Sequence, residues 1–481
     1  MARVPQAQGL LVRSSRLMMP RRFVPLWRDR VPAQRSLLGL TPRPGGFPGR
    51  EAGAPGSLRF LFLLWLILLF APQWWLASHG VALALHLPTL LFALLGLLLL
   101  LRLKVREWYL PLLLLVIFAI LTTPFAFNPA HAIGPAKALI LYWLFAVGTL
   151  SFVQTPRQSV PILLMLGIYQ FAWWGVLGAK NGLVAWVPDL DNYDGFGPLM
   201  VIGTACALHF GLAARSRPMR YFAFVVAAVC TLGLVSSFAR GAVLAAGFVL
   251  AFMLYRSPNK RAAVGGVTLA AAVVVLSGIF LFADVDRGTK DSQRSFFAEI
   301  GTVSRDVDAG TGEDRRVLWK AAWEVFREHP ILGVGGESFG PFAAGYFLPG
   351  TIGGGYSRNP RILYNRKLHS GYFQILCEFG IVGSLLFGWL LVDFWRRNAA
   401  LRTPQYRTAW HAATGGHYDL RWLALGLESG MVAYWGTAVF YNQLFEPWLY
   451  ALLTANALLH SRLTATLRSS VLTPGPALSR T

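Results

Sequence analysis

The sequence has few charged residues and very few cysteines. Only 14% of its 481 residues are Asp, Glu, Lys or Arg, whereas a soluble domain of average composition carries about 25%. This shortage argues against a water-soluble enzyme. The three cysteines, Cys206, Cys230 and Cys377, all fall within apolar stretches, so a disulfide framework is excluded. No metal-binding motif is present, and we expect neither a bound metal nor another cofactor.

Apolar residues make up 55% of the chain and recur in runs that are long enough to cross a bilayer. The mean hydropathy is +0.49. We therefore predict an all-α polytopic membrane protein with about 12 transmembrane helices. The expected spans are 58–77, 82–101, 108–126, 134–153, 159–178, 195–213, 220–238, 241–255, 262–283, 369–395, 422–440 and 445–461.

Basic residues outnumber acidic residues by 44 to 22, which gives a net charge of +22. In a soluble protein this excess would suggest nucleic-acid binding. With the N-terminus inside, however, most of the Lys and Arg residues fall on inside segments of the twelve-span arrangement, as the positive-inside rule predicts. The excess therefore indicates topology and contact with anionic lipids, and no nucleic-acid partner is expected. Both termini are predicted to be cytoplasmic.

The chain divides into six predicted regions. Residues 1–57 carry ten Arg and no Lys, and they are expected to form a disordered basic cytoplasmic tail. A later translation start, at Met18 or Met19, and a transit peptide are the alternatives for this tail. The other regions are membrane helices one to six (58–219), a core with helices seven to ten (220–395), a cytoplasmic loop (396–421), helices eleven and twelve (422–461) and a cytoplasmic tail (462–481).

The core contains one long loop, 284–368, which is predicted to lie outside and which holds half of the 22 acidic residues. Residues 314–329, which precede Pro330, have the periodicity of an amphipathic helix. Six apolar residues are expected on one face: Leu318, Trp319, Ala322, Trp323, Val325 and Phe326. Five charged residues are expected on the other: Arg316, Lys320, Glu324, Arg327 and Glu328. The glycine-rich stretch 333–340 has no Lys-Ser/Thr pair of a phosphate loop and is predicted to be a turn.

Arg315 projects from the apolar side of this predicted helix. Two interpretations follow from that position. Either the helix lies on the outer membrane surface and Arg315 snorkels to water, or Arg315 points into a site between the helix and the spans.

Two further residues at the outer face could carry chemistry. Arg240 lies in a short outside turn, where a guanidinium is costly unless it is solvated or paired; an interfacial anchor is the alternative. His369 begins the tenth span after several cations, which lower an imidazole pKa, so that its neutral ring could act as a general base; a structural histidine is the alternative. Two Arg side chains suit a diphosphate leaving group. Together with Arg315, these residues would suit the transfer of a group from a lipid-linked diphosphate.

Three stretches carry a resemblance to a known family. They are SSFARGA (236–242), DRRVLWKAAWEVFREHPILGVG (314–335) and LHSGYFQILCEFGIVG (368–383). In this order, around one long outside loop, they resemble the O-antigen ligase and O-antigen polymerase superfamily. The resemblance is clearest over 220–390.

The resemblance implies a GT-C-like fold and a metal-independent, inverting glycosyltransferase in the bacterial inner membrane, with its active site facing the periplasm. It implies a donor glycan on undecaprenyl diphosphate, which Arg240 and Arg315 bind, and it implies that His369 is the catalytic base. Further candidate site residues are Lys137, Arg316, Arg366 and Glu378. A lipid A–core acceptor is expected, as in lipopolysaccharide biosynthesis. An O-antigen or exopolysaccharide polymerase and a protein O-oligosaccharyltransferase are the alternatives.

An alternative of another class is a transporter or flippase for a lipid-linked or anionic solute. Such proteins are often built from internal repeats and carry ionisable residues near the middle of the membrane. The sequence shows no internal repeat, and few ionisable residues lie within its spans besides Glu378, Asp393 and Glu428. The charged candidates lie instead at the outer surface, which favours an enzyme.

Overall fold

The computed structural model describes residues 109–160, 193–281, 285–286, 293–301, 311–353, 356 and 358–472. The predicted tail 1–57, the predicted spans 58–77 and 82–101, and most of the predicted span 159–178 lie outside these residues. Within them the chain forms thirteen α-helices. A single antiparallel pair of two-residue strands, β1 (Val285–Asp286) and β2 (Gln293–Arg294), accompanies them in the described residues. The predicted all-helical architecture is confirmed apart from this short pair.

The first part of the bundle consists of apolar helices that begin at polar caps. Asn128 accepts a hydrogen bond from the backbone N–H of His131, and Asn259 accepts one from Ala262, so each satisfies a free amide at a helix start. The elements are α4 (Leu110–Thr122), the 3₁₀ turn η2 (Thr123–Phe125), α5 (Pro129–Phe152), the 3₁₀ turn η3 (Pro156–Ser159), α7 (Tyr193–Ala213), α8 (Arg217–Ser236), α9 (Arg240–Arg256) and α10 (Lys260–Phe280).

The second part alternates between short elements and long helices. The elements are α11 (Phe296–Gly301), α13 (Thr311–Glu328), α14 (Phe339–Tyr346), the 3₁₀ turn η5 (Pro360–Asn365), α15 (Gly371–Leu401), α16 (Pro404–Thr414), α17 (Leu420–Ala438) and α18 (Pro447–Leu472). The predicted loop 396–421 therefore contains a helix. The helix at the predicted last span, 445–461, continues to Leu472.

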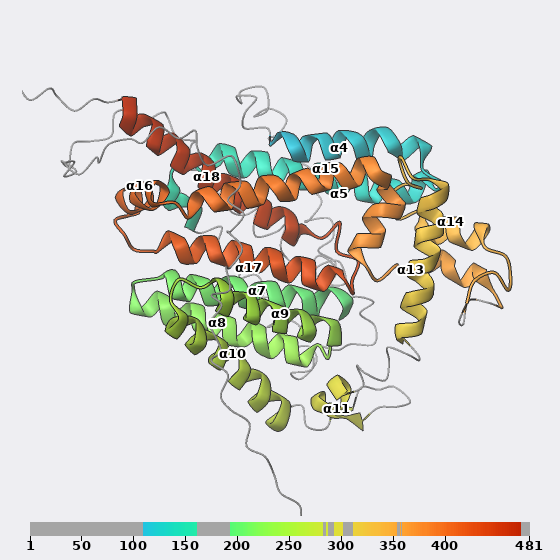
Figure 1. Ribbon diagram of the computed structural model, residues 1–481, viewed down its shortest axis with the longest axis horizontal. Coiled ribbons are helices and arrows are strands. Elements are labelled where there is room, and N and C mark those ends of the chain that lie inside the picture. Colours follow the sequence, from blue (N-terminus) through green and yellow to red (C-terminus); the bar gives the residue numbers. More distant parts are fainter. Residues whose placement is uncertain are drawn as a thin grey trace, which may run out of the picture. The chain divides into compact units, whose positions relative to one another are not determined.

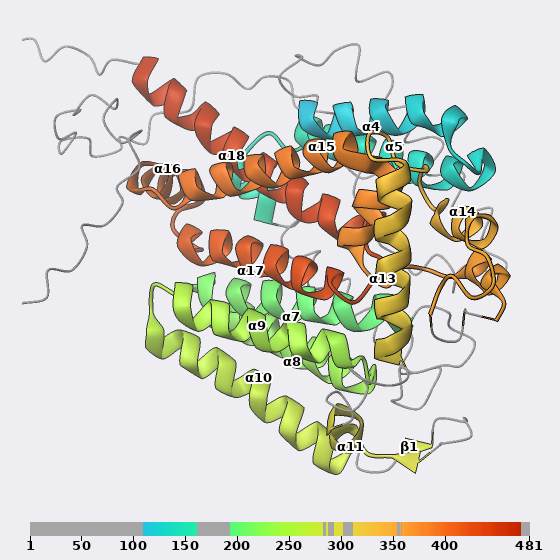
Figure 2. The same ribbon diagram turned by 45° about the vertical axis from the view of Figure 1, so that its right-hand side comes forward.

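The long helices lie side by side, and α13 runs across one set of their ends (Figure 1). Figure 2 shows the same arrangement from another side, with α14 beside α13 and α16 at the opposite ends of the helices. We call these two regions the α13 end and the α16 end. One large cluster of buried apolar side chains joins the long helices, and a second joins α13, α14, η5 and the start of α15. The α13 end therefore has a hydrophobic core of its own.

Five helices among the described residues are long and apolar enough to cross a membrane: α5, α7 (over Phe196–Ala213), α8, α10 and α15. In α10 only 28% of the most apolar stretch is buried. Its exposed face carries Leu269, Leu276 and Phe280. Such a face is unfavourable in water but not against lipid tails. The chain is thus consistent with a multi-pass membrane protein, while the number of twelve spans stays a prediction.

The predicted amphipathic helix over 314–329 is confirmed as α13. Its buried stripe contains Leu318, Ala322 and Val325, as the periodicity predicted. The prediction was wrong for Trp323, which is 46% exposed. Val317 and Ala321 are buried in its place. The contact face is rotated toward these smaller residues, which allow α13 to approach α15 closely.

The helix α15 is not a single regular helix, as one expected span over 369–395 would be. Gly380 has φ 61° and ψ −163°, a conformation that interrupts the helix. The turn after α13 docks at this break: the N–H of Gly335 donates to the Glu378 carbonyl at 2.9 Å, and the N–H of Ile381 donates to the Pro330 carbonyl at 2.8 Å. The backbone groups freed by the break are therefore satisfied by the chain that follows α13. The predicted turn over 333–340 is confirmed up to Ser338, because α14 begins at Phe339.

Candidate functional site

Arg240 is the first residue of α9. The chain passes from α8 to α9 within a few residues and places Phe238 in the left-handed region at φ 51°. The next residue, Gly241, packs so tightly that an added Cβ would lie 2.8 Å from Cβ of Phe440. The start of α9 therefore lies against the segment that follows α17. A half-buried guanidinium there adds to the positive end of the helix dipole, which is a favourable location for an anion.

Arg315 lies in the first turn of α13 and is half-buried. Its guanidinium carbon lies 5.9 Å from the centre of the Phe440 ring, a cation–π arrangement. The indole N–H of Trp319 donates to the Leu368 carbonyl at 3.1 Å, and the Trp319 ring stacks on Phe373. These contacts fix α13 to the start of α15. Of the two interpretations of Arg315, they favour the one in which it points between α13 and the long helices.

His369 lies two residues before α15, with φ 49°. The following N–H, that of Ser370, donates to Oδ1 of Asn442 at 3.0 Å. Burial, together with the positive charges of Arg315, Lys367 and Arg366, lowers the pKa of His369 to about 4. The expected lowering is present, but burial is its first cause. The imidazole is therefore neutral near pH 7 and can accept a proton.

One short segment, 438–442, contacts Arg315 and residues next to Arg240 and His369. Phe440 contacts both Gly241, beside Arg240, and the guanidinium of Arg315. At Gly371, two residues after His369, an added Cβ would lie 3.3 Å from Cβ of Ala438. The structure thus brings parts of the chain from α9, α13 and α15 to the same short connection after α17. Sequence reasoning did not find this connection, because no motif marks it.

The further candidates lie in different places. Arg366 and Glu378 line one cavity of about 360 Å³ beside the His369 segment. Glu378 is buried, and it accepts a hydrogen bond from Nε2 of Gln374 at 3.2 Å. Arg316 is exposed on α13, and Lys137 is exposed on α5.

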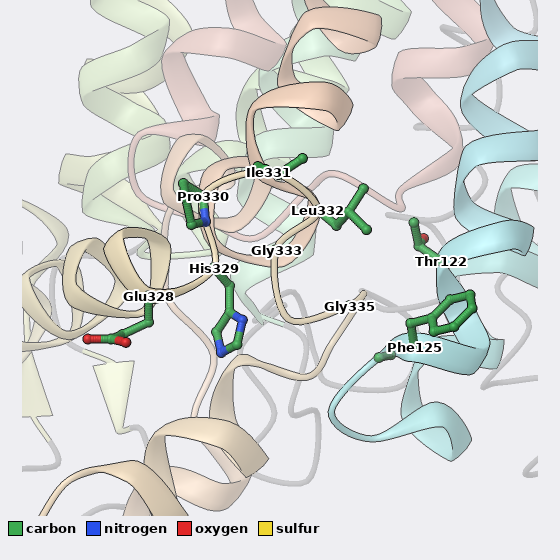
Figure 3. A pocket seen from close by; sticks show the side chains of 10 residues that line it. Thr122, Phe125, Glu328, His329, Pro330, Ile331, Leu332, Gly333 and Gly335 are labelled. Carbon is green, nitrogen blue, oxygen red and sulfur yellow. The ribbon is translucent and has the colours of Figure 1, made fainter.

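A second cavity, of about 330 Å³, lies between η2 and the turn after α13. Figure 3 shows Phe125 on one side of it and the chain from His329 to Gly335 on the other. It is separate from the segment 438–442, and none of the predicted site residues lines it. Among the described residues, no group of three or more His, Cys, Asp or Glu side chains is placed to hold a metal ion.

Residues 198–388 match the family model described as O-antigen ligase. We refer to this matched stretch, which is similar to the family, as the ligase domain. It extends from α7 into α15, and Arg240, Arg315 and His369 all lie within it. The resemblance seen in the sequence is therefore confirmed, and the family that it resembles is one of membrane enzymes of the ligase and polymerase type. The segment 438–442 lies beyond the matched residues. No curated protein matches the chain.

Proposed function

We propose that the protein is a glycosyltransferase of the bacterial inner membrane that faces the periplasm. It transfers a glycan from undecaprenyl diphosphate to an acceptor hydroxyl, with lipid A–core as the acceptor, as an O-antigen ligase does. The observation that carries this proposal is the convergence of α9, α13 and the start of α15 on the segment 438–442. Two arginines and a neutral histidine thereby belong to one region of the ligase domain.

In the proposed reaction, Arg240 and Arg315 bind the donor diphosphate. The acceptor oxygen attacks the anomeric carbon of the glycan, the bond from that carbon to the diphosphate oxygen breaks, and His369 takes the hydroxyl proton. Polyprenyl diphosphate leaves with the bonding electrons. The guanidinium groups stabilise the negative charge that grows on this leaving group, so this step requires no metal ion.

A complementation experiment tests the proposal. A strain that lacks the protein is complemented with the wild type, Arg240→Ala, Arg315→Ala or His369→Ala, and membrane levels are checked by immunoblot. We expect each variant to accumulate lipid-linked glycan and to lose the attached product. His411→Ala, which changes an exposed histidine of α16, is the matched control and should retain the product.

The accumulated material also distinguishes the acceptors. Full-length polymer on the lipid indicates a ligase, whereas single repeat units indicate a polymerase or a protein O-oligosaccharyltransferase. Normal product from a well-expressed His369→Ala variant would remove His369 from the mechanism. If neither glycan pool changes when the protein is absent, transfer is not its function, and a transporter or flippase becomes the better hypothesis.

A further inference from the structure

The cavity of about 360 Å³ beside His369 is built from distant parts of the chain. It falls within the range of about 300–1,000 Å³ that small-molecule sites occupy. Its walls come from α5, the turn before α14, α14 itself, η5, the start of α15 and the connection between α17 and α18. The lining residues that the argument uses are Tyr364, Arg366, Gln374, Glu378, Asn442 and Phe445.

Gln374 is the clearest sign that this cavity receives a ligand. Its side chain is 3% exposed, and its Nε2 donates to Glu378. Its other polar atom, Oε1, is buried and has no hydrogen-bond partner among the described residues. A buried carbonyl oxygen without a donor is unfavourable, and such atoms in folded proteins usually have a partner. A hydroxyl group of a ligand in the cavity would supply that donor.

The chemistry of the walls matches a sugar. Gln374 Oε1 and the Glu378 carboxyl group can accept hydrogen bonds from hydroxyl groups, and the amide N–H groups of Asn442 can donate to their oxygens. The rings of Tyr364 and Phe445 offer apolar surfaces for the C–H faces of a pyranose. The cavity is lined by three carboxyl groups as well as by Arg366 and Lys367, so it is not the predominantly cationic site that a diphosphate requires.

The cavity also adjoins the segment 438–442 at Asn442, near His369, where an acceptor hydroxyl group would be needed. Phe440 contacts Arg315 and Gly241, where the donor diphosphate is proposed to bind. Two residues further on, Asn442 lines the cavity and accepts the hydrogen bond from Ser370, next to His369. The same connection between α17 and α18 thus contacts the arginine region through Phe440 and the cavity through Asn442.

We propose that this cavity binds the terminal sugar of the acceptor glycan and directs one of its hydroxyl groups to His369. This inference rests on the proposed function, since it assumes that a glycan is transferred. The sugar can belong to the core of a glycolipid or to a second polyprenyl-linked oligosaccharide, because both present the same hydroxyl-rich ring.

Steady-state kinetics of the full chain in lipid nanodiscs test the inference. The donor is a polyprenyl-diphosphate oligosaccharide, and the acceptors are a core glycolipid, a second polyprenyl-linked oligosaccharide and a Ser/Thr peptide, each in its own arm. We expect Gln374→Ala to raise the KM for the sugar acceptor about tenfold, as the loss of a hydrogen bond to a buried group does. The KM for the donor should not change.

Tyr364→Ala is a second cavity variant that leaves the hydrophobic core intact, because Tyr364 is 46% exposed at the cavity. It should also raise the acceptor KM and leave the donor KM unchanged. Gln405→Ala, on an exposed position of α16, and Tyr255→Ala, on an exposed position of α9, are the matched controls and should change neither constant.

Three results would overturn the inference. The first is an unchanged acceptor KM in both cavity variants, and the second is a raised donor KM with an unchanged acceptor KM. The third is transfer to the Ser/Thr peptide alone. In the first two cases the wild type transfers glycan to a sugar acceptor, so the proposed function stands. In the third case glycan transfer stands, but lipid A–core is not the acceptor. If the wild type transfers glycan to no acceptor, the proposed function fails, and this inference fails with it.

Discussion

The charged residues Glu428 and Arg315, at the two ends of the helix bundle, differ in how they are paired. Toward the α16 end, the carboxylate of Glu428 is fully buried and accepts a hydrogen bond from Arg402 at 3.2 Å, while Arg256 lies 3.5 Å away. At the α13 end, Arg315 packs over an aromatic ring, and the described residues include no carboxylate paired with it. The charge of Glu428 is thus neutralised at the first end, whereas the guanidinium of Arg315 at the second end is available to an anionic ligand.

This difference distinguishes charged residues that stabilise the fold from charged residues that can bind a ligand. A buried charge with partners of opposite sign stabilises a particular packing of helices, and removing one partner leaves the other charge buried. A cation near the membrane boundary without such a partner is costly unless a ligand, solvent or an aromatic ring compensates it. The buried ion pair toward the α16 end therefore stabilises the packing of the helices, and we assign recognition of the donor to the α13 end.

The largest effect on stability should come from Arg402→Ala. It leaves Arg256 as the partner of the buried Glu428 carboxylate among the described residues. We expect a loss of about 3 kcal/mol in the free energy of unfolding, at the lower end for a broken buried pair. Thermal unfolding in detergent measures this loss. Arg315→Ala should lower the unfolding midpoint far less while abolishing transfer. Equal loss of stability in the two variants would remove the distinction between the ends.

Gly380→Ala should have the next largest effect. At φ 61° an added Cβ would lie 2.4 Å from the Ile331 carbonyl oxygen, which belongs to backbone and cannot move easily. Strain of this type costs about 1–3 kcal/mol. Gly388→Ala is the matched control, because nothing lies within 4 Å of its added Cβ in the same helix. If both variants unfold at the wild-type temperature, the docking of the turn on α15 is not as the structure shows.

A smaller effect is expected for Trp319→Phe. It removes the hydrogen bond to the Leu368 carbonyl and retains a ring that can stack on Phe373. The unfolding free energy should fall by about 1 kcal/mol, and the KM for the donor should rise, since Arg315 lies one turn away on α13. Trp323→Phe, at an exposed position of α13, should leave both quantities unchanged. A donor KM that is the same in the two variants would mean that α13 does not position Arg315.

The smallest effect concerns pH. Because the pKa of His369 is lowered to about 4, the ring loses its capacity as a base only when the pH falls through that value. The acid limb of kcat/KM, which reports the free enzyme, should therefore lie near pH 4. Arg366→Gln removes a nearby cation. The imidazolium is then more stable, so the acid limb should move upward by a few tenths of a pH unit. Arg361→Gln, in the same loop, is the control. An acid limb near 6.5 in the wild type would contradict the burial of His369.

Much of the α13 end could be predicted from the sequence. Helical periodicity predicted α13 and the side from which Arg315 projects, and the glycines at 333–340 predicted a turn. The break at Gly380 was missed, because a glycine within an apolar run gives no sign that its φ is positive. Trp323 was misplaced, because periodicity defines a face but not how closely the neighbouring helix approaches.

Local sequence patterns do not identify the other residues of the candidate site. Phe440 and Asn442 follow an apolar helix, and they meet Arg315 and Ser370 only through tertiary packing. Gln374 lies within an apolar run, where its unpaired oxygen is visible only once the neighbouring elements are in place. Contacts between such distant segments depend on the packing of whole helices, which a single sequence does not reveal.

Binding of a short polyprenyl diphosphate, such as farnesyl diphosphate, tests the central claim most directly. Calorimetry on the protein in nanodiscs would compare the wild type with Arg315→Ala and with Arg396→Ala, which removes an exposed arginine toward the α16 end. Loss of a charge-assisted contact should weaken binding about tenfold or more in Arg315→Ala, and Arg396→Ala should bind like the wild type. Equal affinity of all three proteins would contradict the assignment of the donor site to the α13 end.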